Sequence, residues 1–182
     1  MGGGGAERQV IEILRHLDRS RFQPALYLAS RSGELLSEVP SDVRVHAFSD
    51  RPNSGWRSRL IRATRMTALA RWNDLARVLA SEQIDLVYDR TFHATVDAAM
   101  ACWLKPTPRV SCCVCDPESD WKLYARRMPL FSRRFSRWVF ASASVVLCNS
   151  DGLRRKLVEF HSLPDSQVHT FYNLVDLESL QQ

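Results

Sequence analysis

Residues 84–104, IDLVYDRTFHATVDAAMACWL, place a short apolar run directly ahead of a helical segment. Ile84–Tyr88 has the length and composition of a buried strand. Ala94–Leu104 has those of a helix, which Pro106 and Pro108 end. A strand followed at once by a helix is half of a βαβ unit, so this stretch favours a parallel sheet covered by helices.

The same alternation of strands and helices extends over the rest of the chain. Helices of ten or more residues between continuous apolar strands are typical of a parallel sheet buried on both faces. We therefore expect an α/β fold with a Rossmann-like, mostly parallel sheet and helices on both faces. The predicted strands are Pro24–Ala29, Val43–Phe48, Ile84–Tyr88, Arg109–Cys115, Ser144–Cys148 and Val168–Phe171, and the predicted helices lie near Val10–Leu17, Gly33–Val39, Ser58–Ser81, Ala94–Leu104, Trp121–Ser142 and Asp151–Phe160.

Composition and charge restrict the class of protein. The 182 residues suffice for one domain with a substantial core. A net charge of +5 indicates an anionic partner, which can be a nucleotide, a membrane surface or a nucleic acid. The sequence shows neither a secretory leader nor a membrane-spanning apolar run, and its five cysteines form no disulfide framework. We expect a cytoplasmic protein, at most peripheral at the inner face of the membrane.

In parallel sheets, ligands bind in the loops beyond the carboxyl ends of the strands. The candidate site residues therefore follow the predicted strands. These segments are the glycine run Gly2–Gly5, Ser30–Gly33, Asp89–His93, Cys115–Asp120, Asn149–Asp151 and Asn173–Asp176.

Taken in order, GGAER, DLVYDRTFHAT, VVLCNSDGLRRKL and VHTFYNLVDLESL resemble the N-terminal domain of retaining glycosyltransferases of the GT-B fold, the large family-4 kind. The resemblance covers almost the whole chain. It implies an acceptor-side domain over residues 1–172 and the start of an interdomain linker at 173–182. It also implies carbohydrate biosynthesis by hexosyl transfer, with retention, from a nucleotide sugar to a carbohydrate or lipid-linked acceptor. No metal or cofactor is implied, since helix dipoles and basic side chains stabilise the leaving phosphate.

The resemblance also implies roles for individual residues. The glycine loop would lie under the donor diphosphate, where glycine lets backbone N–H groups approach phosphate at a helix N-terminus. A histidine near the acceptor can accept a proton or hold a sugar hydroxyl. The matched positions are Gly4, Gly5, Ala6 and Glu7 in the donor loop, His93 and Ser150 on the acceptor side, and Asn173 and Asp176 in the interdomain turn.

Two charged residues enter as candidates because each follows a predicted strand. Arg90 can act as a cation near phosphate or an acidic acceptor, or form a surface ion pair with Asp89. Asp116 is a candidate catalytic carboxylate, or a turn residue ahead of Pro117. The cysteines of SCCVC lack the second ligand pair of a zinc site, so we interpret them as small hydrophobic side chains in a buried strand.

The segment Arg126–Phe140, RRMPLFSRRFSRWVF, carries five arginines among bulky apolar residues. One interpretation is a surface helix whose apolar side packs on the sheet. The other is a peripheral contact with anionic lipid, which lipid-linked acceptors in the resembled family would favour. Because no nucleic-acid motif accompanies the charge, we predict no nucleic-acid partner.

The chain departs from the family pattern in four places. A K-I-L-x-V strand ahead of the glycines is missing, and so is the C-terminal domain with its E-x7-E motif. Arg90 and Cys115 stand where the family often has histidines, and Leu174 replaces the glycine of N-G-V-D. Because the missing strand would lie mid-sheet, we expect two half-sheets with open edges, and low stability or aggregation.

These departures leave more than one function open. We expect the isolated chain to be inactive as a transferase. The alternative is a non-catalytic fragment or pseudoenzyme that serves as a binding module. A nicotinamide-dependent Rossmann protein is disfavoured, since GGGGAER lacks the last glycine of G-x-G-x-x-G at the required offset.

Overall fold

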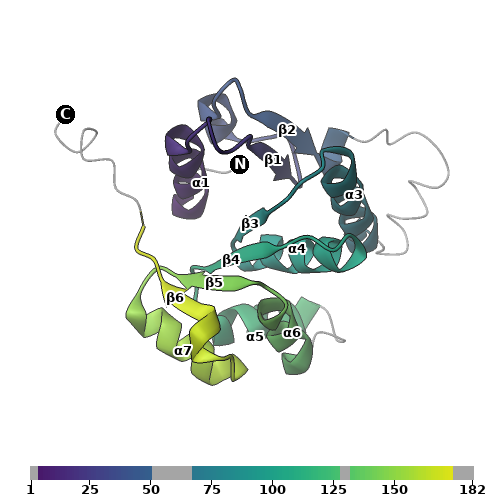
Figure 1. Cartoon of the computed structure of the whole chain (residues 1–182). Helices are drawn as coiled ribbons and strands as arrows, with labels where there is room; N and C mark the ends of the chain where they lie inside the picture. Colours follow the sequence, from purple (N-terminus) through teal and green to yellow (C-terminus); the bar gives the residue numbers. More distant parts are fainter. Residues whose placement is uncertain (1–3, 51–66, 128–131, 174–182) are drawn as a thin grey trace. The chain divides into compact units, whose positions relative to one another are not determined.

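A computed structural model describes residues 4–50, 67–127 and 132–173. The chain divides into two compact units, one with Met1–Asp74 and Asn173–Gln182 and the other with Leu75–Tyr172. The boundary falls within helix α3 (Thr67–Ser81), and Figure 1 shows the elements of both units in chain order. Among the described residues, no helix has both the length and the apolar composition of a membrane span.

The first unit contains two parallel strands, β1 (Ala25–Leu28) and β2 (Arg44–Ala47). Leu26 lies opposite Val45 in their register. The unit's other elements are α1 (Gly5–His16), η1 (Glu34–Glu38) and η2 (Phe48–Asp50). An amphipathic pattern places Ile11 and Leu14 of α1 in the core.

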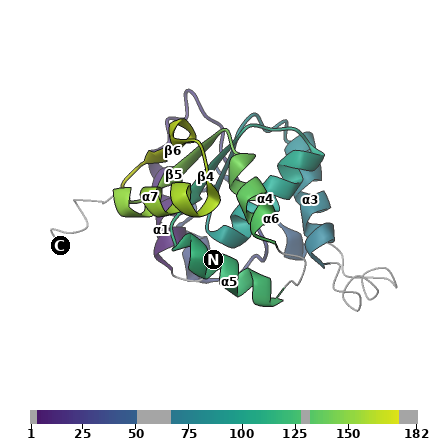
Figure 2. The same cartoon turned by 90° about the horizontal axis from the view of Figure 1, so that it is seen from below.

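The second unit contains a four-stranded parallel sheet in the order β3 (Val87–Arg90), β4 (Arg109–Cys113), β5 (Val145–Cys148), β6 (Val168–Thr170). Consecutive right-handed crossovers place their helices on one face of such a sheet. Contacts of α6 with both α4 and α7 agree, and Figure 2 shows these helices next to one another. The helices are α4 (Phe92–Leu104), α5 (Pro117–Arg127), α6 (Arg133–Ala141) and α7 (Asp151–His161), with η3 (Asp165–Gln167) ahead of β6.

A fully buried polar cluster lies between this sheet and its helices. Arg109, 1% exposed, donates to Asp89 at 3.0 Å and also to the carbonyl of Val139 in α6. Asp89 accepts two more hydrogen bonds, from Thr95 of α4 at 2.6 Å and from Ser111 of β4 at 2.8 Å. The cluster therefore links two strands to two helices.

The predicted α/β fold with parallel strands is confirmed. The described strands form two separate sheets, as expected for a sheet that lacks its middle strand. The low stability expected of such half-sheets stays a prediction. The predicted strand Ile84–Tyr88 starts and ends too early, because β3 runs from Val87 to Arg90. Asp89 is thus buried in the strand rather than exposed in a loop. Pro129 and the predicted helix start at Ser58 lie outside the described residues.

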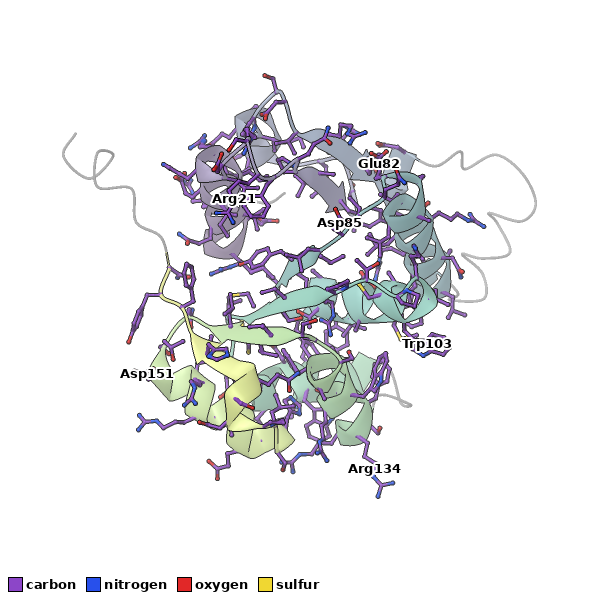
Figure 3. The ribbon with its side chains drawn as sticks, in the orientation of Figure 1. Arg21, Glu82, Asp85, Trp103, Arg134 and Asp151 are labelled. Carbon is purple, nitrogen blue, oxygen red and sulfur yellow. The ribbon has the colours of Figure 1, made fainter. Side chains whose placement is uncertain are left out.

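We predict that Asp89→Ala lowers the free energy of unfolding by about 3–5 kcal/mol, because Arg109 would stay buried without its carboxylate. Urea denaturation measures this change. Asp85→Ala is the matched control, since Asp85, which is labelled in Figure 3, is exposed and its removal is expected to cost less than about 0.5 kcal/mol. Equal effects of the two substitutions would contradict a stabilising role for the buried pair.

Candidate functional site

The carboxyl ends of the four strands in the second unit form one edge of the sheet. In the parallel register Arg90 lies opposite Cys112, Cys113 opposite Cys148, and Cys148 opposite Thr170. The connections that follow these strands therefore leave the sheet at the same edge. The residues predicted from the sequence that end or follow these strands include Arg90, His93, Asp116 and Ser150.

The connection after β3 has an unusual backbone. Thr91 is the N-cap of α4 and has φ 74° and ψ 143°. A β-branched residue rarely adopts positive φ, and such strain is found where the surrounding structure fixes a conformation. The Thr91 carbonyl accepts hydrogen bonds from both the backbone N–H and the hydroxyl of Thr95, each at 2.9 Å. This turn sets where α4 begins, and so it places His93 in the first turn of that helix.

His93 lies in the first turn of α4, with its side chain exposed at the strand-end edge. Its Nδ1 forms a hydrogen bond with the hydroxyl of Tyr124 in α5. Tyr124 is buried and packs edge-on against Phe92, with ring centroids 4.8 Å apart. The phenol thus fixes the orientation of the imidazole, which is the arrangement that a general base or a hydroxyl-binding histidine requires.

Arg90 is the last residue of β3 and is half-buried. Its guanidinium donates to the Tyr88 hydroxyl at 3.2 Å and to the Cys112 sulfur at 3.4 Å. The alternative prediction, a surface ion pair of Arg90 with Asp89, is wrong. Asp89 is buried, not on the surface, and it pairs with Arg109. Burial raises the pKa of Tyr88 to about 12, so its phenol is neutral beside Arg90.

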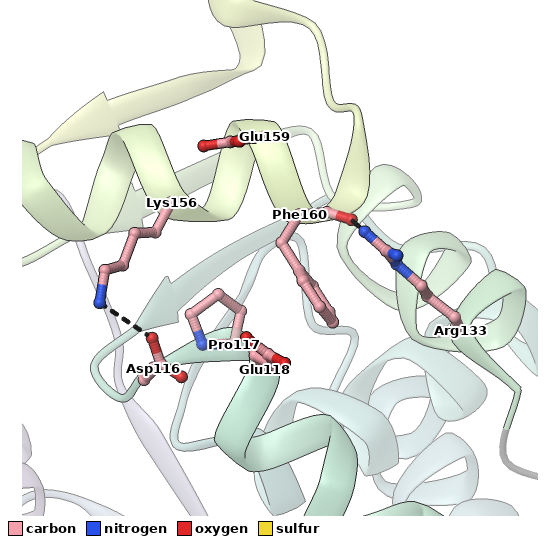
Figure 4. A pocket seen from close by; sticks show the side chains of 7 residues that line it. All are labelled: Asp116, Pro117, Glu118, Arg133, Lys156, Glu159 and Phe160. Atoms are coloured by element: carbon pink, nitrogen blue, oxygen red, sulfur yellow. Dashed lines mark hydrogen bonds and ion pairs between the residues drawn. The ribbon is translucent and has the colours of Figure 1, made fainter.

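Asp116 caps helix α5. Its carboxylate accepts from the Ser119 backbone N–H at 3.0 Å and from the Ser119 hydroxyl at 2.9 Å. These bonds, the backbone one first, lower the pKa of Asp116. It also lies 3.3 Å from Lys156 of α7 in a hollow of about 260 Å³ (Figure 4). His93, Arg90 and Ser150 do not line this hollow, so a catalytic role of Asp116 stays a prediction.

Asp120 ends the candidate segment Cys115–Asp120, in which the sequence singles out Asp116 and gives Asp120 no role of its own. It follows Asp116 by one helical turn and is half-buried. Burial, and then the negative charge of Asp116, raise the pKa of Asp120 to about 6. Residues four apart share a helix face, which places Asp120 in line with Tyr124, the partner of His93. Two acidic residues one turn apart after a strand were the available sequence signal.

The remaining predicted residues outside the glycine loop are Ser150 and the residues of the interdomain turn. Ser150 caps α7 as predicted, since its hydroxyl accepts from the Leu153 N–H at 3.2 Å. Asn173 is the last described residue of the chain, and Asp176 lies outside the described residues, as does Leu174.

The cysteines follow their predicted role in part. Cys112 and Cys113 are buried in β4, but Cys115 is exposed because that strand ends at Cys113. The hydrogen bond to Cys148, and then burial, raise the pKa of the Cys113 thiol. Within the described ranges, no group of three His, Cys, Asp or Glu side chains is placed to hold a metal ion.

The glycine loop belongs to the first unit and opens α1 at Gly5. The Gly4 N–H donates to the Glu7 carboxylate at 3.2 Å, and the Gly4 carbonyl accepts from the N–H groups of Glu7 and Arg8. A Cβ added at Gly5 would meet no atom within 4 Å. Packing therefore does not require glycine at Gly5, and a role of this loop in ligand binding stays a prediction.

Comparison with known proteins covers nearly the whole chain. Residues 3–179 match the model of Glycosyltransferase Family 4. Anabaena HepE in complex with UDP and glucose has a TM-score of 0.66 and 20% identity, with 96% of this chain and 42% of that chain covered. The apo lipopolysaccharide outer core galactosyltransferase WaaB has a TM-score of 0.65 and 11% identity, with 97% and 44% covered. A glycosyltransferase from Rickettsia africae ESF-5 has a TM-score of 0.62 and 16% identity, with 98% of this chain and 45% of that chain covered.

The chain spans less than half of the length of these structures, and at such identities they show the fold. No curated protein matches the sequence significantly.

We predict that Asp120→Asn raises the urea midpoint of unfolding at about pH 7.5. Folding raises the pKa of this carboxyl from about 3.9 to about 6, so the wild-type anion destabilises the folded state above that range. The gain should shrink as the pH falls through about 6 and vanish below about 4, where both states are protonated.

Asp116→Asn gives the contrasting result. It keeps an oxygen that can cap α5 but removes an anion whose pKa folding lowers, so it should reduce the midpoint at neutral pH. If Asp120→Asn leaves the midpoint unchanged or lowers it at neutral pH, the assignment of Asp120 as the destabilised carboxyl is incorrect.

Proposed function

The chain belongs to Glycosyltransferase Family 4, and on that basis we propose that it is the acceptor-side part of an enzyme that transfers a sugar from a nucleotide sugar to an acceptor. The observation that carries this proposal is the family match over residues 3–179. The strand-end edge of the second unit supports it, since that edge gathers a fixed histidine, a cation and a carboxyl of raised pKa.

We further propose that the donor is a UDP-hexose and that transfer proceeds with retention. The UDP and glucose bound to Anabaena HepE support this choice of donor. In the proposal the loop Gly4–Glu7 lies under the diphosphate, with the N–H groups at the start of α1 directed to phosphate oxygens. Glu7 would have to release the Gly4 N–H when the anion binds, because its carboxylate accepts that bond in the free chain.

The acceptor would bind at the strand-end edge of the second unit. His93 can accept a proton from the acceptor hydroxyl, or it can hold that hydroxyl by a hydrogen bond. Arg90 can neutralise the charge of a phosphate or of an acidic acceptor. Asp120 can exchange a proton near neutral pH at this edge. Transfer of this type needs no metal when dipoles and cations stabilise the leaving phosphate.

A peripheral membrane contact is also part of the proposal. Helix α6 buries Val139 and Phe140 on one side and exposes Arg133, Arg134 and Arg137. An exposed row of arginines suits the anionic inner face of a membrane, where a lipid-linked acceptor would be found. The part of Arg126–Phe140 at 128–131 lies outside the described residues.

The test of the function is turnover of nucleotide sugars. We expect the 182-residue chain alone to release no UDP from UDP-glucose, because the resembled family holds most of the nucleotide in a second domain. The complete polypeptide encoded by the reading frame that contains these residues is expected to transfer hexose, with the product's anomeric configuration read by NMR. Turnover by the chain alone would refute the first expectation, and a complete polypeptide without transfer would favour the binding-module alternative.

A second prediction isolates the glycine loop. In the complete polypeptide, Gly5→Ala should lower kcat/KM for the nucleotide sugar by about 10- to 100-fold, because Cβ would hold phosphate away from the backbone N–H groups. Gly152→Ala is the matched control, since Gly152 opens α7 and its added Cβ also meets no atom within 4 Å. Similar kinetics for the two variants would contradict a phosphate-binding role for the loop.

A further inference from the structure

A second hollow lies on the helix layer, between α6 and the end of α7. Its volume is about 340 Å³. His161 ends α7, whereas Ser150 caps the start of that helix, so about 15 Å of helix separates this hollow from the strand-end edge. The residues that line it are Arg133, Arg134, Arg137, Phe160, His161 and Ser162.

The lining is strongly cationic. Arg133, Arg134 and Arg137 are exposed, and Arg137 follows the other two by four and three residues, which puts it beside each of them on one side of α6. Figure 3 shows Arg134 extending outward from that helix. No aspartate or glutamate contributes to the described lining. Within the described part of the chain, Arg134 and Arg137 form no ion pair with a carboxylate.

Arg133 is held in place before any ligand arrives. Its Nη2 and Nε donate to the Phe160 carbonyl at 2.6 and 3.2 Å, as Figure 4 shows for this pair. Its guanidinium also lies over the Phe160 ring, 4.2 Å from the centroid. A guanidinium has five N–H donors, so others remain for a ligand. A cation whose orientation is already fixed loses little conformational entropy on binding.

His161 forms the floor of the hollow. It is only 2% exposed and packs against Phe140 and Phe160, with ring centroids 5.2 and 4.8 Å away. Its Nε2 lies 3.4 Å from the Ser136 hydroxyl, whereas its buried Nδ1 has no hydrogen-bond partner in the described structure. Burial, and then the charges of Arg133 and Arg137, lower the pKa of His161 to about 4. The positive potential that opposes a proton on this ring attracts an anion.

We propose that the hollow between α6 and α7 is a phosphate-binding site, with Arg133, Arg134 and Arg137 as the donors. Planar guanidinium groups bind two phosphate oxygens at once, and three of them more than neutralise the charge of about −2 on a phosphate monoester. The phosphate can come from a soluble phosphate monoester or from an anionic lipid headgroup. The site does not depend on sugar transfer, although a headgroup there would account for the proposed membrane contact.

The first arm of the test uses inorganic phosphate and the 182-residue chain. We expect titration to shift the NMR signals of the His161 imidazole, which lies beneath the arginines. In R134Q/R137Q the dissociation constant should rise at least about tenfold. The matched control R8Q/R155Q removes two exposed arginines outside the hollow and should change it less than about twofold. Urea denaturation of both variants checks that each is folded.

The second arm uses sedimentation with vesicles of phosphatidylglycerol and phosphatidylcholine, against phosphatidylcholine alone. Binding to the anionic vesicles that R134Q/R137Q loses and the control retains supports a lipid headgroup as the source. Phosphate binding without vesicle binding supports a soluble monoester. The proposal is overturned if R134Q/R137Q binds both probes as well as the control does, or if neither probe binds the wild-type chain. Neither failure bears on nucleotide-sugar turnover.

Discussion

The buried ion pair between Asp89 and Arg109 is the constraint on which the second unit depends. A charge that is removed from water must find partners, and here each ion has several. Asp89 accepts from both a helix and the neighbouring strand, while Arg109 reaches the carbonyl of Val139 near the end of α6. Sliding β3 by one residue would direct Asp89 to the opposite face and leave Arg109 without a carboxylate, so the pair fixes the strand register.

That register determines which side chains reach the strand-end edge. Because side chains alternate along a strand, Tyr88 and Arg90 point to the face opposite Asp89, and their mutual hydrogen bond agrees. Thr95, which binds Asp89, also binds the carbonyl of Thr91, so the buried cluster is joined to the strained turn that starts α4. His93 is therefore oriented from two sides, by this turn and by Tyr124 of α5.

The sequence predicts what depends on neighbours along the chain and fails on what depends on neighbours in space. The cap at Ser150 and the strands β5 and β6 on either side of it follow from local pattern, and the structure confirms all three. Asp89 directly follows an apolar run, which predicts a loop there, because local pattern does not reveal its partner Arg109 twenty residues away. The sequence does not single out Asp120 within Cys115–Asp120 for a related reason, since its raised pKa comes from burial that only the packing of α5 creates.

The arginine-rich helix shows how a structural contact can prepare a binding surface. The last carbonyls of an α-helix have no partner within it, and Arg133 supplies one for Phe160 near the end of α7. This bond joins α6 to α7 and fixes one guanidinium at the hollow, while Val139 and Phe140 anchor the other side of α6 in the core. Two further arginines on the same side extend the charge outward at no cost to packing. The positive potential over His161 therefore follows from how the helices join, before any anion binds.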